Sequence, residues 1–278
     1  MIVNIIARGR VKVIMRLTEL ISKTAKPITK SDWIKVLKQM NIVNEELLII
    51  YADLKSFDYV IGGAQTVIEA IYEVAGYHAT IIMPAHSINQ TCPTFFDETL
   101  PKKWKATIHK NTPAFDLELS PILAGAVSET FARNQNISRS DHPVASYLAT
   151  GRKADWFMAN HQLQSMFGEK SPLQKLYAQD AKVLCLGVDY TQLTALHLAE
   201  YFANCRPLTT HEAVLMQNGK RTLVEFEDLA LDSSSFNELG VAYEQVTNVQ
   251  KYPLGEAMCF LLDYRSLIDF ATEYLKGN

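Results

Sequence analysis

The sequence predicts an α/β fold in which a central mixed sheet is flanked by helices. Short apolar runs typical of buried strands alternate with helical patterns along most of the chain. With 278 residues, the chain can bury a substantial core without the help of a metal or a disulfide. Its hydrophobic content of 48% and charged content of 21% are ordinary for a globular protein and unlike those of a disordered chain.

The first part of the chain predicts one βαβ-like unit followed by a long binding loop. A helix, a buried strand, a second helix and a second buried strand are expected at 31–40, 46–51, 64–76 and 79–85. Thr29 or Ser31 is suited to cap the first helix, and Gly62 and Gly63 precede the second. Residues 84–120 contain four prolines and are too long for a passive connection, which is typical of a binding loop.

The second part continues the alternation and includes a β-hairpin region near the C-terminus. Helical patterns are expected at 121–134, 151–168, 171–180, 194–204 and 263–275, and strands at 144–150, 182–188 and 257–262. Ser171 and Pro172 suit the N-cap and first turn of the short helix that they begin. Asn218-Gly219 lies between two strand-like runs, which is a strong hairpin signal.

Residues 15–278 are expected to form a single domain, since no repeat, low-complexity tract or linker divides them. Arg8, Arg10 and Lys12 interrupt the apolar start of the chain, so no signal peptide is predicted. Met15 begins an amphipathic pattern, and residues 1–14 are hypothesised to be an extension from an upstream start codon. No window approaches the ~18 uncharged apolar residues that a membrane-spanning helix needs, so no membrane partner is expected.

Charge and cysteine usage exclude several classes of function. The formal net charge is −3, and no run of Lys and Arg could track phosphates, which argues against nucleic acid as a partner. The four cysteines form no CxxC pair and have no ligand-like spacing to histidine, so no metal site is expected. Their scarcity and apolar surroundings fit a reducing cytoplasm best. The phosphate-loop, nucleophile-elbow, zinc-helix and dinucleotide motifs are also absent.

The stretch TALHLAEYFAN at 194–204 carries the clearest candidate for chemistry. His197 and Glu200 are three residues apart, so they share one face of a helix that follows a buried strand. If Thr194 is the N-cap, His197 lies in the first turn, where the helix dipole favours a neutral imidazole that can accept a proton. Glu200 can then hold the other ring nitrogen. Spacing alone supports a satisfied core histidine about as well as a catalytic base.

Other polar groups are weaker candidates. Arg139 and Ser140 lie in a Pro-ended loop and could bind phosphate, but from the residues alone a loop that packs its own side chains is the favoured explanation. Gly62 and Gly63 could offer backbone N–H groups to an anion, or could serve close helix–strand packing. His86 follows the second buried strand and could reach the same cleft as His197.

Taken together and in order, these segments resemble the aminoglycoside 3-N-acetyltransferase family of coenzyme A-dependent enzymes. The resemblance runs collinearly from about residue 20 to the C-terminus. The matching segments are GGAQTVIEAIYEV, IIMPAHS, PAFD, ETFAR, RSDHPVASYLATG, NHQLQSMFGEKSPLQKLY, and KVLCLGV followed by LHLAEY. No single segment is decisive, and the order and spacing of all of them carry the resemblance.

The resemblance implies transfer of an acetyl group from acetyl-CoA to the amine of an aminoglycoside-like amino sugar. His197 would be the general base, oriented by Glu200, with no covalent acyl-enzyme. The expected cofactor contacts are Asp53, Leu54, Lys55, Ser56, Gly62, Gly63, Arg139 and Ser140. The expected acceptor contacts are His86, Asp116 and Glu129. A homodimer is also reasonable by this resemblance.

Two segments depart from the family pattern. Tyr51-Ala52-Asp53-Leu54-Lys55 replaces a segment that is usually similar to His-Ser-Ser-Leu, and it places a carboxylate where a hydroxyl would face the anionic cofactor. Thr191-Gln192-Leu193-Thr194 replaces an Asp-Ser-Asn-Thr-like turn. These changes leave two alternatives open, which are an acyltransferase for a nucleotide-linked or cell-surface amino sugar and a non-catalytic CoA-binding protein of the same fold.

Overall fold

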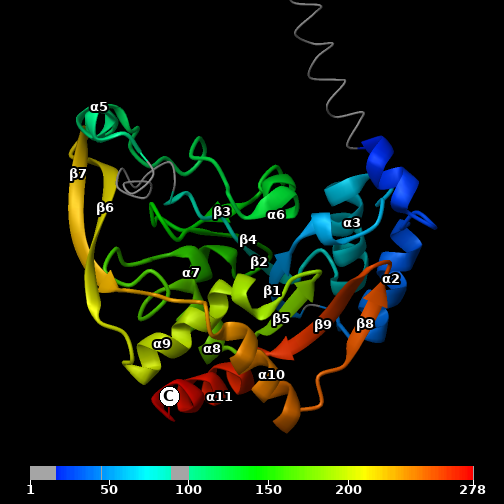
Figure 1. The fold of residues 1–278 in the computed structure, drawn as a ribbon. Helices are drawn as coiled ribbons and strands as arrows, with labels where there is room; N and C mark the ends of the chain where they lie inside the picture. The colour runs from blue at the N-terminus through cyan, green and yellow to red at the C-terminus, as the bar shows by residue number, and fades with distance from the viewer. Residues whose placement is uncertain (1–16, 45, 89–99, 278) are drawn as a thin grey trace, which may run out of the picture.

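A seven-stranded mixed sheet forms the centre of the molecule in the computed structural model, which describes residues 17–44, 46–88 and 100–277 (Figure 1). The strands lie in the order β3-β4-β2-β1-β5-β9-β8. Their bounds are β1 Leu47–Ala52, β2 Thr80–Pro84, β3 Ser138–Arg139, β4 Tyr147–Thr150, β5 Lys182–Leu186, β8 Lys251–Leu254 and β9 Ala257–Asp263. The predicted α/β fold with a central mixed sheet is confirmed.

The three inner strands β2, β1 and β5 are parallel, whereas the outer strands run antiparallel to their neighbours. The carboxyl ends of β2, β1 and β5 therefore meet at one edge of the sheet, which is where ligands usually bind in α/β folds. The side chains of β1 alternate between two hydrophobic clusters: Leu48 and Ile50 belong to one, Ile49 and Tyr51 to the other. Both faces of the sheet are thus buried, as its near-continuous apolar strands predict.

Helices cover both faces of the sheet (Figure 1). One face carries α2 (Lys30–Gln39), α3 (Gly63–Ala75) and α6 (Gly125–Phe131). The other face carries α7 (Ala154–Met158), α8 (Pro172–Ala178), α9 (His197–Ala203), α10 (Phe236–Val246) and α11 (Tyr264–Gly277). Two predicted caps are confirmed, because the Thr29 hydroxyl accepts the Asp32 N–H at the start of α2 and Ser171 caps α8. Within the described residues, no helix has the length and apolar character to cross a bilayer.

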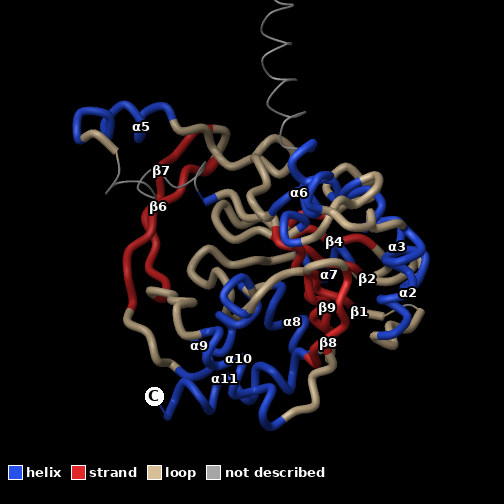
Figure 2. Tube along the Cα trace, turned by 45° about the vertical axis from the view of Figure 1, so that its right-hand side comes forward, coloured by secondary structure: helices blue, strands red, loops and turns tan. Residues whose placement is uncertain are grey.

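The β-hairpin forms a separate two-stranded sheet beside the main one (Figure 2). Its strands β6 (Leu208–Gln217) and β7 (Lys220–Leu229) are joined by Asn218 and Gly219, both with positive φ, of 50° and 75°. This two-residue turn confirms the predicted hairpin. At its tip, α5 (Lys105–Asn111) is fastened by Arg221, which donates to the carbonyls of Thr112 and His109.

Three local predictions are wrong. The helical pattern at 151–168 forms only α7, because Ala159 is extended and Asn160 is left-handed with φ of 56°. The long loop contains helical turns, namely α5 and the 3-10 turn Lys102–Trp104. Thr194 does not cap the helix of His197, which is preceded by a 3-10 turn at Thr194–Leu196. The proposed extension at 1–14 lies outside the described residues.

Candidate active site

The sheet edge at the carboxyl ends of β1, β2 and β5 gathers the polar residues of the site. Asp53 follows β1 directly, and His86 lies two residues after β2. The segment after β5 leads through a 3-10 turn at Tyr190–Gln192 to Thr194 and His197. Tyr147 begins β4 at the same edge, since it pairs with Pro84. The carboxyl ends of three parallel strands lie at the same edge of the sheet, and this brings together residues that are far apart in sequence.

His197 and Glu200 form a buried pair at the start of α9. Nδ1 of His197 and Oε2 of Glu200 are 2.5 Å apart, and the two side chains are 11% and 0% exposed. The i, i+3 spacing places them on one face of the helix, as the sequence predicts. The imidazole is stacked on Phe167 at a ring-centroid distance of 5.3 Å, and Phe236 lies against it at 5.0 Å. The ring is therefore held in one orientation by a carboxylate and two aromatic side chains.

The other oxygen of the Glu200 carboxylate also has partners. Oε1 accepts a hydrogen bond from Nε of Arg206 and another, 3.2 Å long, from the backbone N–H of Asp232. A buried carboxylate is costly unless it is paired and hydrogen-bonded, and here both requirements are met. Glu200 thus links the imidazole on one side with a guanidinium on the other.

The Thr194 hydroxyl lies at the centre of an uncharged network. It is 3.0 Å from the Tyr51 hydroxyl, 3.1 Å from the Tyr147 hydroxyl and 3.2 Å from Nε2 of His86. One donated and two accepted bonds use the full capacity of a hydroxyl group. Burial lowers the pKa of His86 to about 3 and raises the pKa of both tyrosines. The network is therefore neutral at physiological pH.

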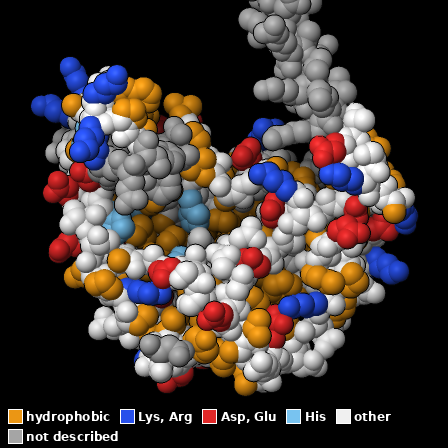
Figure 3. All heavy atoms as spheres, viewed as in Figure 1, with side chains coloured by type: hydrophobic (Ala, Val, Ile, Leu, Met, Phe, Trp, Pro, Cys, Tyr) orange, Lys and Arg blue, Asp and Glu red, His pale blue; other side chains and the backbone are white. Residues whose placement is uncertain are grey.

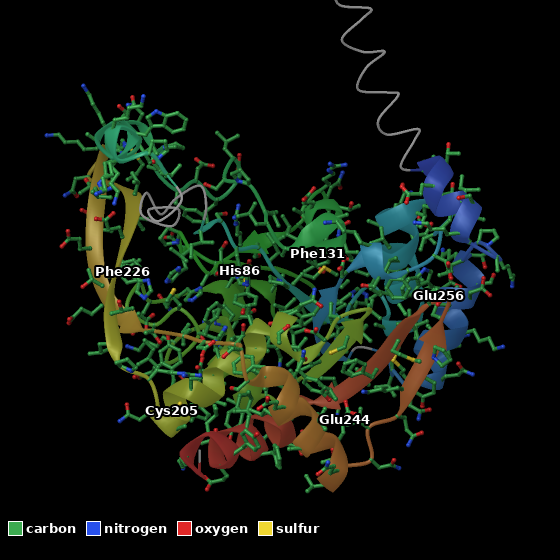
Figure 4. The ribbon with its side chains drawn as sticks, in the orientation of Figure 1. His86, Phe131, Cys205, Phe226, Glu244 and Glu256 are labelled. Atoms are coloured by element: carbon green, nitrogen blue, oxygen red, sulfur yellow. The ribbon has the colours of Figure 1, made fainter. Side chains whose placement is uncertain are left out.

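Two cavities adjoin these residues, and His86 lines both. The first, of about 250 Å³, also has His197, Phe167 and His211 in its wall. The second, of about 310 Å³, is lined by Thr194 and by residues of the β1 and β5 ends. In the space-filling view, histidine and hydrophobic side chains are visible in a hollow between the hairpin and the main body (Figure 3). Figure 4 places His86 in the middle of the molecule, with Phe226 on the hairpin to one side.

The residues expected to contact the cofactor fall into different places. Asp53 and Lys55 line the 310 Å³ cavity, and the Asp53 carboxylate accepts the Lys55 N–H at 3.0 Å. Leu54 and Ser56 belong to the same 3-10 turn, Leu54–Ser56. Gly62 and Gly63 lie at the start of α3, and neither lines the two cavities.

Arg139 and Ser140 are instead engaged by the protein itself. The five N–H groups of Arg139 donate to Ser146 Oγ, Ser87 Oγ and the carbonyls of Leu117, Ser120 and Ala85. The Ser140 hydroxyl accepts the Tyr147 N–H and lies 3.0 Å from Nδ1 of His161. Both side chains hold loops together, and a cofactor contact would require these bonds to be exchanged.

The acceptor residues are likewise divided. His86 lies beside His197, since Phe167 contacts both rings at centroid distances of 5.6 and 5.3 Å. Asp116 and Glu129 are exposed and line neither cavity. Hydrogen bonds from the backbone N–H groups of Leu119 and Glu118 lower the pKa of Asp116, so its carboxylate organises its own turn.

The sequence did not predict three features of the site. These are the hydrogen bonds that the Thr194 hydroxyl makes with three side chains, the two aromatic side chains beside His197, and the contact of Arg206 with Glu200. Thr194 and Arg206 flank the HxxE pair closely enough for their proximity to be a signal. The aromatic contacts could not have been found from sequence, because Phe167 and Phe236 come from the loop before α8 and from α10.

Two further buried histidines next to the site predict how stability depends on pH. His142 accepts the N–H groups of Val144 and Ala145 through Nδ1, so its ring is neutral. Burial lowers the pKa of His142 well below 6.5, that of His161 to about 4 and that of His86 to about 3. Since the unfolded chain takes up these protons first, stability is fully present above pH 6.5 and is lost as the pH falls from 6.5 towards 4.

The slope of this loss is set by the number of groups. Each histidine contributes up to about 1.4 kcal/mol per pH unit, so we expect a combined slope of up to about 4 kcal/mol per pH unit. Urea unfolding at pH values between 4.5 and 7.5 would measure it. A His142→Gln variant that folds should show a smaller slope, and a free energy of unfolding that does not change over this range would contradict the prediction.

Comparison with known proteins decides the family. The model of the family described as aminoglycoside 3-N-acetyltransferase matches residues 49–276. The chain belongs to the aminoglycoside 3-N-acetyltransferase family. Members named for this activity are acyltransferases, and the chain is an acyltransferase of this family.

Relatives cover nearly the whole chain. An SPbeta prophage-derived aminoglycoside N(3′)-acetyltransferase-like protein, YokD of Bacillus subtilis (strain 168), is 30% identical over 263 residues, which are 94% of this chain and 97% of that protein. The crystal structure of YokD matches with a TM-score of 0.89 and covers 94% of this chain and 98% of that chain. Aminoglycoside N(3)-acetyltransferase IX of Micromonospora chalcea is 30% identical over 222 residues, 78% of each chain.

Proposed function

We propose that this family member transfers an acetyl group from acetyl-CoA to the amine of an aminoglycoside-like amino sugar. His197 is the general base in this proposal, and no covalent acyl-enzyme forms. The observation that carries it is the buried His197–Glu200 pair, 2.5 Å apart, with the His197 ring in the wall of a cavity. The name of the Micromonospora chalcea relative supports an aminoglycoside-like acceptor.

The orientation of the imidazole decides which of its nitrogens can act. Because Nδ1 faces the Glu200 carboxylate, Nδ1 carries the proton and Nε2 is left with the lone pair. An ammonium group cannot attack a thioester, so the acceptor amine must lose a proton, and Nε2 takes it. The lone pair of the neutral amine forms the new C–N bond as the C–S bond breaks. The nitrogen gives a second proton to the departing sulfur, so CoA leaves as the thiol, and the imidazolium then releases its proton to solvent. The Glu200 carboxylate stabilises the imidazolium that exists in between.

The two cavities suit two substrates that meet at His86. The 310 Å³ cavity has both Asp53 and Lys55 in its wall, and of the two it is the Lys55 ammonium that suits the anionic acetyl-CoA. We assign the turn at residues 53–56 to this cosubstrate, with Gly62 and Gly63 as further backbone contacts. The 250 Å³ cavity beside His197 would hold the acceptor amine, with His86 in contact with both substrates.

Acetyl-CoA binding and thiol release test this function. Calorimetry should detect binding of acetyl-CoA and CoA, and thiol-release assays over a panel of amino sugars should detect turnover. Lys55→Glu should weaken acetyl-CoA binding by about 3- to 10-fold, because it reverses one charge near an anion. Lys38→Glu on the exposed side of α2 is the control and should change nothing.

The outcomes separate the alternatives. If CoA does not bind at millimolar concentration, both CoA-dependent acyltransferase functions are excluded, for an aminoglycoside-like acceptor and for a nucleotide-linked or cell-surface amino sugar. If CoA binds but no amine is acetylated, the chain is a non-catalytic CoA-binding member of the fold. If amino sugars that carry phosphate are preferred, the acceptor is a nucleotide-linked sugar.

A further inference from the structure

Arg206 is the charged residue that completes the site on the side away from the cavity. It lies six residues after Glu200, in the connection between α9 and β6. Its Nε donates to Oε1 of Glu200, the carboxylate oxygen that His197 does not use. The three side chains therefore form a continuous chain from imidazole to carboxylate to guanidinium.

The burial of Glu200 gives this contact an energetic role. The carboxylate has no exposed surface, whereas the Arg206 side chain is 23% exposed. An ionised carboxylate removed from water is expensive unless a cation and hydrogen-bond donors face it. When His197 is neutral, as a base must be before it acts, Arg206 is the cation among the described residues that directly contacts this carboxylate. The guanidinium thus compensates the charge of the Glu200 carboxylate while the base is ready to accept a proton.

Arg206 also joins the two ends of the hairpin. Its Nη2 donates to the Asp232 carbonyl at 3.1 Å, and its Nη1 lies 3.7 Å from the Asp232 carboxylate. Next to it, the Ala230 N–H donates to the Pro207 carbonyl at 2.9 Å. The chain enters the hairpin just after Arg206 and leaves it just before Asp232. One guanidinium therefore fixes the base of the hairpin and the carboxylate behind His197 at the same time.

We propose that Arg206 is a positioning residue for acetyl transfer, which acts through Glu200 to hold His197 in its reactive orientation. The inference rests on the proposed role of His197 as the general base. Arg206 touches neither cavity, so its effect should appear in turnover rather than in the binding of either substrate.

Three variants test the role of Arg206. Arg206→Met keeps the length of the side chain and removes the charge, whereas Arg206→Lys keeps the charge. Arg221→Met is the matched control, because Arg221 also fastens the hairpin through carbonyl contacts but lies at its far end. We expect Arg206→Met to lower kcat by about 10- to 100-fold, with the acceptor KM changed by less than about threefold. Arg206→Lys should restore most of kcat, and Arg221→Met should keep it.

A measurement that does not need turnover tests the contact itself. A short hydrogen bond between an imidazole N–H and a carboxylate gives a proton resonance far downfield of the amides, which ¹⁵N-histidine labelling assigns to Nδ1 of His197. The signal should be present in the wild type, Arg206→Lys and Arg221→Met, and lost in Arg206→Met. Calorimetry with CoA on each variant shows that the variant has folded and binds the cosubstrate.

The results separate this inference from the proposed function. Unchanged kcat in Arg206→Met, or a retained downfield signal in that variant, would overturn the positioning role. Equal losses of kcat in Arg206→Met and Arg221→Met would also overturn it, since a general effect of hairpin attachment would then explain both. If the wild type transfers no acetyl group, the proposed function fails, and the downfield signal still decides whether Arg206 orients the pair.

Discussion

His197→Gln is expected to lower kcat by about 1,000-fold, because removal of a general base costs about 100- to 10,000-fold. Glutamine fills much of the space between Phe167 and Phe236 but has no nitrogen that can take the proton of the amine. Thiol-release kinetics at saturating acetyl-CoA would measure the loss. Binding of CoA should stay within about twofold, since His197 does not line the 310 Å³ cavity.

His211→Gln is the control for this experiment. His211 lines the same cavity as His197, and its ring is stacked on Phe226 at a centroid distance of 5.5 Å. We expect this variant to change the acceptor KM more than kcat, because His211 belongs to the cavity wall and has no carboxylate partner within the described residues. Turnover near the wild-type level in His197→Gln would refute the assignment of the base.

Glu200→Gln is expected to have the second largest effect, with kcat lowered by about 100-fold. The neutral amide cannot stabilise the imidazolium. Its NH₂ group replaces one of the two oxygens that His197 and Arg206 contact, so a donor faces a donor at one of these positions. The variant should also lose about 2 kcal/mol of stability, because buried hydrogen-bond donors are left without an acceptor. Stopped-time thiol assays and urea unfolding would measure the two effects separately.

Glu244→Gln is the matched control for Glu200→Gln. Glu244 also has two partners, because it accepts a hydrogen bond of 3.0 Å from the Tyr190 hydroxyl and forms an ion pair of 2.7 Å with Lys251. It lies on α10 and lines neither cavity (Figure 4). Its variant should keep kcat. A similar kcat in Glu200→Gln and the wild type would show that His197 needs no carboxylate, and the proposed orientation would then be wrong.

Much of the fold follows from local patterns in the sequence. The strands β1, β2 and β5 are apolar on both faces, the Asn218-Gly219 turn requires two positive φ angles, and Ser171 caps its helix. The helical pattern at 151–168 was misleading because tertiary contacts replace helical ones there. The Asp228 carboxylate, for example, accepts the Met166 N–H at 2.7 Å from β7.

The site was predictable only in part. The spacing of His197 and Glu200 gives their contact, since a helix brings i and i+3 together. Partners from other elements, such as Asp232 behind Glu200 and Tyr147 beside Thr194, depend on tertiary structure and leave no local pattern. The cofactor contact of Arg139 stays a prediction, and its guanidinium, which suits phosphate, binds five protein acceptors that no local pattern indicates. The homodimer and the cytoplasmic location stay predictions.

The hairpin can be regarded as an exchangeable part of the enzyme. Within the described residues its strands pair only with each other. It joins the body through separate contacts, among them Arg206 with the Asp232 carbonyl, the Met166 N–H with the Asp228 carboxylate, and the Phe115 N–H with the Val214 carbonyl. The hairpin contributes His211 and Leu229 to the 250 Å³ cavity. These two residues can vary without any change to β5 and α9, which position His197, or to the turn at 53–56. Under the proposed function, we expect that grafting residues 208–229 between relatives that keep the Asp228 contacts changes acceptor preference while the general base stays with the host, a route by which one scaffold could diversify its substrates.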